Sequence, residues 1–469
     1  MSGVVVAGYL AILVWVGWRT RGASRDAAGF FAAGRGLGTS LLVLTLLASI
    51  MSGFTFVGGP ALFARVGVSS LWIVLSASFT GGLMAWLYGG LFHRLAVQEG
   101  CLTVPDVLAV RFGGRDVARC AAAVTVVGSV AYLAVQVRAL DRLLEGFGRL
   151  PGGMTVAHVC LAILVLYSWL GGMRAGVLTD ALQGLVMVGV AALCVYVPWN
   201  WEGGVGGFAR ALTRTSPDLV SPWGTVGPGT ALGWFFLFAV GSLGQPHVVN
   251  RFLMVRDPEK TRWFPVLLAL VMGVCTLVWV VAGGSMAVLT AQGGLDPGRH
   301  PDEAVVRFLE HVAPSWLVPL FLVAAAAAVM STADSFLTAA AAAVAHDLGW
   351  GARHPRGEVF WARITTLALV LVAAGVAYAW EGLLVHLGVF SFGAFAAALT
   401  PVLTAGLYLR EVTRRAALVS MGVGFAGVFV LQGLTVVGRR TAVPPELLAM
   451  AAAFLVLLLP FGRRVGSDR

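Results

Sequence analysis

The chain has 469 residues, of which 58% are hydrophobic and only 12% are charged, about half the charged share of ordinary soluble proteins. A soluble protein of this size is excluded, because it would need a far more charged surface. The net charge of +10 does not indicate nucleic-acid binding, since nearly all the basic residues are arginines in short loops between apolar segments.

Apolar segments of transmembrane length follow one another along the chain. A membrane-spanning helix needs about 20 mostly apolar residues, and thirteen segments meet this requirement. They are expected at residues 2–18, 38–64, 66–92, 119–148, 154–172, 175–198, 229–250, 263–290, 315–346, 361–380, 382–409, 415–437 and 445–462. Residues 302–311, between the eighth and ninth spans, are expected to form a short surface helix. The sequence therefore predicts an all-α integral membrane protein.

Basic residues set the expected orientation in the membrane. The first span is preceded by no basic residue and followed by Arg19, Arg21 and Arg25, which is the wrong polarity for a cleaved signal peptide. With the N-terminus outside, 22 of the 32 Lys and Arg residues fall in inside segments, Arg251 among them, and 7 fall outside. Because cytoplasmic loops carry the excess of basic residues, we expect an inner-membrane protein with a cytoplasmic C-terminus.

Glycine and proline interrupt two of the predicted spans in their middles. The second span contains Gly53 and then Gly58, Gly59 and Pro60, and the seventh contains the run 241–247 with two glycines and a proline. Such residues release backbone carbonyls from the helix ladder, and lipid tolerates released groups only where protein or water satisfies them. Paired interrupted helices mark the binding site of inverted-repeat transporters; the alternative is a pair of tightly packed kinks.

Oxygen-bearing side chains share one face of the ninth predicted span. Ser331, Asp334 and Ser335 are spaced i, i+3 and i+4, and together with released carbonyls they suit a small hard cation. Alternatively, the hydroxyls bond back to their own helix or pack against a neighbour. A carboxylate inside a span is costly and usually functional. Asp180, near the start of the sixth span, is either a first-turn acid favoured by the helix dipole or a second cation ligand.

Other kinds of active site find no support in the sequence. There is no nucleotide-binding P-loop, no pair of catalytic acids and no zinc-like Cys and His pattern. The five cysteines are interpreted as reduced thiols. We therefore expect a protein that is not an enzyme and that takes energy for transport from an ion gradient or from a partner subunit.

Four sequence runs carry a family resemblance. They are Ala-Ser-Ile-Met-Ser-Gly at 48–53, Gly-Gly with Thr-Asp and Gln at 171–183, Gly-Gln-Pro-His at 244–247 with Arg-Phe at 251–252, and Met-Ser-Thr-Ala-Asp-Ser at 330–335. In this order they resemble the sodium/solute symporter family, which includes sodium-coupled proline, sugar and sialic acid transporters. The resemblance covers almost the whole chain.

The resemblance implies an inverted five-plus-five helix core with broken helices. Residues 1–37 would hold an extra helix and a cytoplasmic loop, 38–228 the first repeat with an outside loop, 229–410 the second repeat, and 411–469 two peripheral helices. It also implies a sodium site between the second and ninth spans. Its ligands would be the carbonyls of Ala48, Met51 and Ala328 and the hydroxyls of Ser331 and Thr332.

Some members of that family have a further cation site. The matching positions in this chain are Asp180, Ser331, Asp334 and Ser335, although Asp334 could carry a proton instead. The proline transporters place an acid where this chain has Ile50.

The resemblance places the solute pocket where the second, fourth, seventh and eleventh spans meet. Its candidate residues are Thr55, Gln136, Phe238, Ser242 and Pro246. Proline transporters have two aromatic residues where this chain has Phe238 and Ser242, so proline is disfavoured. Residues 68–90 contain no Asp, Glu, Asn or Gln, which argues against sugars.

We therefore predict a sodium-coupled symporter that imports a small organic solute, either an amino acid or a monocarboxylate. The expected partners are this solute and membrane lipid. The alternatives are a proton-coupled symporter and a transporter-like sensor that acts with a separate signalling partner.

Overall fold

Long apolar segments fold into helices because a helix satisfies its own backbone hydrogen bonds, as a membrane requires. The computed structural model of the protein describes residues 2–21, 27–33, 36–145, 154–294, 304–351, 357–379, 384–436 and 443–459. Within these ranges the chain is helical and has no β-strand apart from an isolated bridge between Leu37 and Val255. The predicted all-α fold is confirmed.

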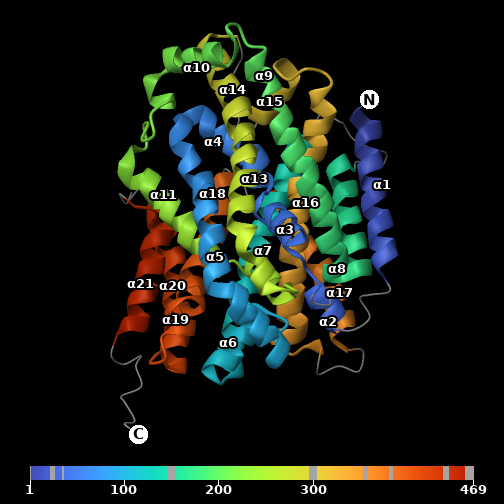
Figure 1. Ribbon diagram of the computed structural model, residues 1–469, viewed down its shortest axis with the longest axis vertical. Coiled ribbons are helices and arrows are strands. Elements are labelled where there is room, and N and C mark those ends of the chain that lie inside the picture. Colours follow the sequence, from blue (N-terminus) through green and yellow to red (C-terminus); the bar gives the residue numbers. More distant parts are fainter. Residues whose placement is uncertain are drawn as a thin grey trace.

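The helices follow one another in a single bundle (Figure 1). The longer ones are α1 (Ser2–Thr20), α3 (Thr39–Ile50), α4 (Gly59–Val66), α5 (Leu71–Gln98), α6 (Val104–Phe112), α7 (Arg115–Leu144), α8 (Val156–Leu193), α10 (Gly204–Thr215), α11 (Gly227–Gly241), α13 (Phe264–Val278), α14 (Gly284–Ala291), α15 (Ala304–His311), α16 (Leu317–Ala342), α17 (Gly357–Ala379), α18 (Leu384–Leu403), α20 (Arg414–Val436) and α21 (Pro445–Leu458). The shorter ones are α2 (Ala27–Ala32), η3 (Phe54–Gly58), α9 (Tyr196–Trp199), η8 (Ser242–Gly244), α12 (Pro246–Val249), η9 (Asn250–Met254), η11 (Trp279–Gly283), η13 (Ala343–Asp347) and α19 (Ala405–Tyr408). The surface helix predicted at 302–311 is present as α15.

Ten helical stretches in the described part of the chain are long and apolar enough to cross a membrane. Two of them hold more than one predicted span, since α4 and α5 form one continuous stretch and α8 contains a break. The helices α3 and α21 are apolar but shorter. A multi-pass membrane protein is confirmed, and the number of thirteen spans stays a prediction.

Helix α16 forms the centre of the bundle. It packs against α8, α7, α1 and α3. In its most apolar segment of 18 residues, 89% of the residues are buried, whereas the same share for α17 is 22%. A run of alanines, 324–328, lets neighbouring helices approach closely. Helices α20 and α21 pack on α18 along one edge, and α1 lies on the opposite side of the bundle (Figure 1). Helices α9, α10 and α15 gather at one end of the bundle, and α2 and α6 at the other (Figure 1).

Gly172 breaks helix α8 between the predicted fifth and sixth spans. Its backbone has φ 51° and ψ −149°, inside a stretch that is otherwise helical. Side chains other than glycine rarely adopt a positive φ. A Cβ atom here would also lie 2.7 Å from the ring of Phe30. The break therefore needs a glycine for two independent reasons.

Replacing Gly172 with alanine is expected to destabilise the protein by about 1–3 kcal/mol, the usual magnitude of such backbone strain. Thermal unfolding of the purified protein in detergent measures this effect. Gly189→Ala is the matched control, because Gly189 lies in the same helix and a Cβ there would meet no atom within 4 Å. Equal unfolding temperatures for the two variants would contradict the assignment of strain to Gly172.

An ion-paired cluster joins three segments at the end of the bundle that carries α6. The ring nitrogens of His346, on η13, lie 3.0 Å from Asp106 on α6 and 3.1 Å from Glu358 on α17. Asp347 accepts a hydrogen bond of 2.7 Å from Thr103. Burial would raise the pKa of the Asp106 carboxyl, but the hydrogen bond and charge of His346 hold that pKa below its ordinary value. The cluster ties α6 to the ends of α16 and α17.

Candidate functional site

Helix α3 ends at Ile50, and its last carbonyls are released from the helix ladder. Met51 leaves the helix with ψ 112°. In a continued helix the Ser52 N–H would bond to the Ala48 carbonyl, but it donates to the Thr55 hydroxyl at 3.3 Å instead. The Thr55 N–H likewise bonds to the Ser52 carbonyl at 2.9 Å and not to that of Met51. The sequence prediction of freed carbonyls at this position is confirmed by these contacts.

Two hydroxyls of α16 point at the freed carbonyls. Ser331 donates to the Ala48 carbonyl at 2.8 Å and is 3.2 Å from the Ala328 carbonyl in its own helix. Thr332 donates to the Met51 carbonyl at 2.8 Å. All five residues are buried. The structure thus brings together the five predicted sodium ligands in one place, between the predicted second and ninth spans.

This cluster of five oxygens has the chemistry of a small monovalent cation site. Its ligands are hard and carry no formal charge, and they include the carbonyl end of α3, where the helix dipole favours positive charge. Unwound carbonyls and half-helix ends of this kind coordinate coupling ions in transporters. A hydroxyl keeps acceptor lone pairs, so Ser331 and Thr332 can bind a cation once their protons turn away from it.

Gln136 on α7 supports the break after α3. Its side-chain oxygen accepts the Gly53 N–H at 2.9 Å, and the residue is completely buried. A Cβ on Gly53 would lie 2.7 Å from the Ala139 Cβ, so α7 packs directly against the break. Gln136 was predicted to contact solute, and the structure instead places it behind the broken helix.

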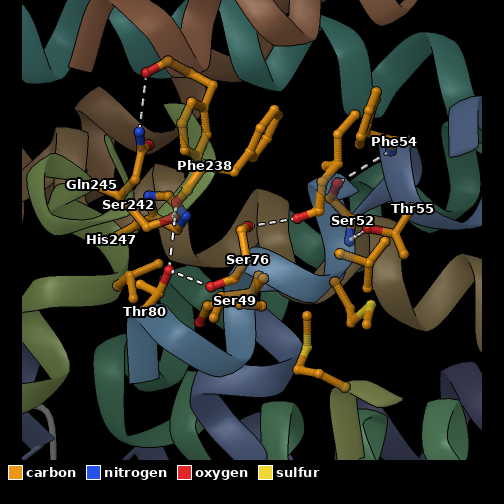
Figure 2. A pocket seen from close by; sticks show the side chains of 18 of the residues that line it. Ser49, Ser52, Phe54, Thr55, Ser76, Thr80, Phe238, Ser242, Gln245 and His247 are labelled. Atoms are coloured by element: carbon orange, nitrogen blue, oxygen red, sulfur yellow. Dashed lines mark hydrogen bonds between the residues drawn. The ribbon is translucent and has the colours of Figure 1, made fainter. Parts of the chain in front are cut away.

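A cavity with an empty volume of about 700 Å³, part of it open to solvent, lies beside the five-oxygen cluster (Figure 2). Of the predicted solute residues, Thr55, Phe238 and Ser242 line it, whereas Gln136 and Pro246 do not.

Aromatic rings form part of the cavity lining. Phe238 stacks on Phe392 with ring centroids 4.3 Å apart, and it lies 6.4 Å from Phe54 in a parallel arrangement. Trp279 meets Phe54 edge to face at 5.8 Å. Aromatic walls of this kind bind the apolar body of a solute.

The cavity lining also carries neutral polar groups that the sequence prediction missed. They are Ser49, Ser52, Ser76, Thr80, Tyr132, Gln245 and His247. The hydroxyls have internal partners: Thr80 donates to the Ala239 carbonyl at 3.0 Å, and Tyr132 lies 3.2 Å from the Ser52 hydroxyl. No Asp, Glu, Lys or Arg is found among the lining residues of the described chain.

Three polar atoms of the lining residues are buried without a hydrogen bond in the described chain. They are Oε1 of Gln245, Nδ1 of His247 and Nε1 of Trp279. The amide nitrogen of Gln245 donates to the Phe392 carbonyl at 3.0 Å, which fixes the orientation of the side chain. Buried polar atoms normally have partners, so these unpartnered atoms are candidates for contact with a bound solute.

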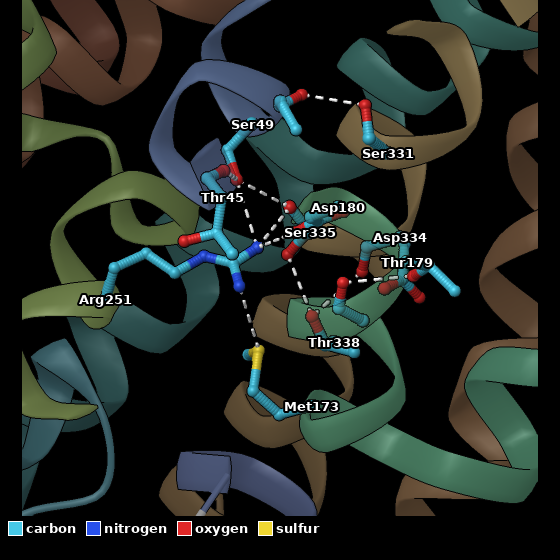
Figure 3. A network of polar contacts seen from close by, with 12 residues as sticks. Thr45, Ser49, Met173, Thr179, Asp180, Arg251, Ser331, Asp334, Ser335 and Thr338 are labelled. Carbon is cyan, nitrogen blue, oxygen red and sulfur yellow. Dashed lines mark hydrogen bonds and ion pairs between the residues drawn. The ribbon is translucent and has the colours of Figure 1, made fainter. Parts of the chain in front are cut away.

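The residues predicted for the further cation site have different hydrogen-bond partners. Asp180 and Ser335 both contact Arg251, at 2.6 Å and 2.8 Å (Figure 3). Ser331 bonds instead to the Ala48 carbonyl. Asp334 accepts a hydrogen bond from Ser168 of α8. Arg251, which the sequence analysis counted among the loop arginines, is only 1% exposed.

The fold is shared with solved transporter structures. A sodium-coupled sialic acid symporter, in a substrate-bound outward-open state, superposes with a TM-score of 0.81 at 17% identity and covers 97% of this chain and 96% of its own. A nucleobase-cation-symport-1 family transporter, closed around bromovinylhydantoin, gives a TM-score of 0.58 at 13% identity over 92% and 93% of the two chains.

Sequence comparison gives relatives of similar length. The chain is 27% identical to the sodium/pantothenate symporter of Escherichia coli over 94% of this chain and 90% of the relative. It is 25% identical to the sodium/proline symporter of the same organism over 94% and 88%, and 25% identical to the high-affinity proline transporter PutP of Bacillus subtilis over 89% of each. The model of the sodium:solute symporter family matches residues 30–424. The chain therefore belongs to the sodium:solute symporter family and is a sodium-coupled symporter of a small organic solute.

Proposed function

We propose that the coupling sodium ion binds between the end of α3 and the middle of α16. Its ligands are the carbonyls of Ala48, Met51 and Ala328 and the hydroxyls of Ser331 and Thr332. The observation that carries this proposal is the set of hydrogen bonds from Ser331 and Thr332 to the Ala48 and Met51 carbonyls, both at 2.8 Å.

The solute binds in the neighbouring cavity, and one segment connects the two sites. Met51 contributes a carbonyl to the proposed sodium site and also lines the cavity. Its neighbours Ser49 and Ile50 line the cavity too. Sodium that orders this segment would favour the form that accepts solute, and the bundle would then rock inward. Coupling is the difference in the stabilisation of the two forms by the ion.

The preferred solute is an amino acid or a monocarboxylate with an apolar body. The aromatic rings of the cavity lining support the apolar body. The unpaired Oε1 of Gln245 supports an amino group, from which it can accept a hydrogen bond. Two relatives are named for pantothenate and for proline, and both of these solutes carry a carboxylate.

The organisation of the chain is proposed as two inverted repeats, 38–228 and 229–410, flanked by 1–37 and 411–469. The protein would lie in the inner membrane with its N-terminus outside and its C-terminus in the cytoplasm. The placement of α10 and α15 at one end of the bundle and α6 at the other supports opposite sides of the membrane for these helices, and the basic residues of the loops support the direction (Figure 1). Labelling of single cysteines in whole cells, at α10 and at α6, tests it: accessibility of α6 alone from outside would reverse the orientation.

The thermal stability of the purified protein in sodium and in potassium tests the proposed function. A ligand that binds only the folded state adds about 2.7 kcal/mol at a hundred times its Kd. We expect a sodium-specific rise that one class among amino acids, monocarboxylates and sugars enlarges. A solute response that follows pH, with no effect of sodium, would instead support proton coupling.

Replacing Phe238 with alanine is expected to raise the KM for solute about tenfold, which corresponds to about 1.4 kcal/mol, because the aromatic wall loses its central ring. The number of sodium ions bound per chain should not change. Transport kinetics and sodium binding measure the two effects. Phe236→Ala is the control, since Phe236 lies in the same helix and is 49% exposed. An unchanged KM for Phe238→Ala would remove this wall from the solute site.

A further inference from the structure

The guanidinium of Arg251 lies in an enclosed cluster of oxygen atoms from three helices (Figure 3). Its Nη2 atom is 2.6 Å from Oδ2 of Asp180, 2.8 Å from the Ser335 hydroxyl and 3.0 Å from the Ser49 hydroxyl. These residues come from α8, α16 and α3, and each is at most 1% exposed. One positively charged nitrogen thus has the oxygen neighbours that a bound metal cation would have.

Two of these three oxygen donors, Asp180 and Ser335, belong to the set that the sequence analysis assigned to a further cation site. The structure fills their position with a side chain from η9. We infer that Arg251 is a tethered cation that occupies this site permanently, so that the chain binds one sodium ion per transport cycle. This inference rests on the proposed sodium site at Ser331 and Thr332.

The chemistry of arginine favours permanent occupancy over exchange with sodium. A guanidinium stays protonated at every physiological pH, so Arg251 cannot vacate the site by losing its charge. A sodium ion that entered beside it would place two positive charges together in a buried environment, where their repulsion is weakly screened. The carboxylate of Asp180 neutralises one positive charge, and the guanidinium already supplies it.

Arg251 is also connected to the proposed sodium site. Ser49 follows Ala48 directly in α3, and Ser335 lies one helical turn after Ser331 in α16. The Ser49 and Ser335 hydroxyls are 3.0 Å apart. Arg251 therefore holds α3 and α16 together one turn away from the ion, where a second sodium ion would otherwise do so.

Equilibrium binding of radioactive sodium to the purified full-length protein, at saturating concentration, tests the inference. We expect one ion per chain for the wild type and for Arg251→Lys, which keeps a positive charge in the cluster. Arg251→Met should bind two ions, and Asp180→Asn with Arg251→Met should bind one again. Two ions on the wild type, or one ion on a folded Arg251→Met, would overturn the inference.

Two further measurements keep the test decisive. Asp180→Asn alone should still bind one ion, and loss of sodium binding in that variant would show that Asp180 is a sodium ligand and overturn the inference. Ser331→Ala and Thr332→Ala together should bind no ion, but should bind one when Arg251→Met is added. If the Ser331 and Thr332 variant itself still binds sodium, the proposed sodium site has failed; if the triple variant binds none, the inference about Arg251 has failed.

Discussion

Replacing Ser331 and Thr332 together with alanine is expected to abolish sodium-dependent uptake while leaving the fold intact. The two hydroxyls are the only side-chain donors in the proposed sodium site, and their contacts to a charged partner are worth about 1.5–3 kcal/mol each. Their combined loss of about 3–6 kcal/mol weakens sodium binding by at least about a hundredfold. Uptake into proteoliposomes with an imposed sodium gradient measures it.

Thr338→Ala is the matched control for this experiment. Thr338 lies on the same helix and is also buried, but its hydroxyl bonds only to carbonyls of its own helix, at 2.8 Å to Asp334 and 3.1 Å to Ser335. Its loss should leave sodium-dependent uptake close to that of the wild type. Unchanged sodium dependence in the Ser331 and Thr332 variant would remove the site assignment.

Replacing Asp180 with asparagine is expected to lower the free energy of unfolding by about 3–5 kcal/mol, because it leaves the buried charge of Arg251 without its partner. Neutralising both members, with Asp180→Asn and Arg251→Gln, should recover most of this loss. Chemical denaturation in detergent, followed by circular dichroism, compares the variants. The double variant contradicts the expectation if it is less stable than Asp180→Asn.

The ion pair between Asp116 and Arg414 provides the surface control. It is as short as the buried pair, at 2.6 Å, but its side chains are 41% and 49% exposed. Solvent screens such a pair and hydrates either member when the other is lost. Asp116→Asn should therefore unfold close to the wild type, and the contrast with Asp180→Asn isolates the effect of burial.

Local chemistry explains how the proposed sodium site could be derived from the sequence. Gly53 and the Gly-Gly-Pro run at 58–60 disfavour a regular helix, so released carbonyls near them were expected directly from the residues. The hydroxyl face of α16 followed from the helical spacing of Ser331, Asp334 and Ser335. The family resemblance then paired the two segments, and the contacts of Ser331 and Thr332 agree with that pairing.

The position of Arg251 could not be predicted in the same way. Its neighbours in the chain suggested a loop at the cytoplasmic face, because an arginine at the end of an apolar segment usually reaches the membrane surface. Its partner Asp180 is 71 residues away in the sequence. Only the tertiary structure, in which the Arg251 side chain reaches Asp180 on α8 and Ser335 on α16, brings the charges together.

The position of each residue along the helix axis decided the outcome at the solute cavity. Gln136 and Tyr132 are both on α7 and one turn apart, yet Tyr132 lines the cavity and Gln136 faces the broken backbone at Gly53. The spacing of residues indicates which of them share a face but not which element that face meets. His247 and Gln245 belong to the Gly-Gln-Pro-His run at 244–247. The sequence does not show that these side chains have atoms without partners beside a cavity, because that depends on the packing around them.

The cavity-lining residues 49–51 lie next to or within the proposed sodium site, which has a practical consequence for protein engineering. A library that varies these positions to obtain a new solute preference would also disturb the carbonyls of Ala48 and Met51 that are proposed to bind sodium, so many of its members would lose energy coupling. Ser76, Thr80, Phe238 and Phe392 line the same cavity and contribute no ligand to the proposed ion site. A library restricted to these four positions is therefore expected to change the solute preference and to keep the coupling to sodium.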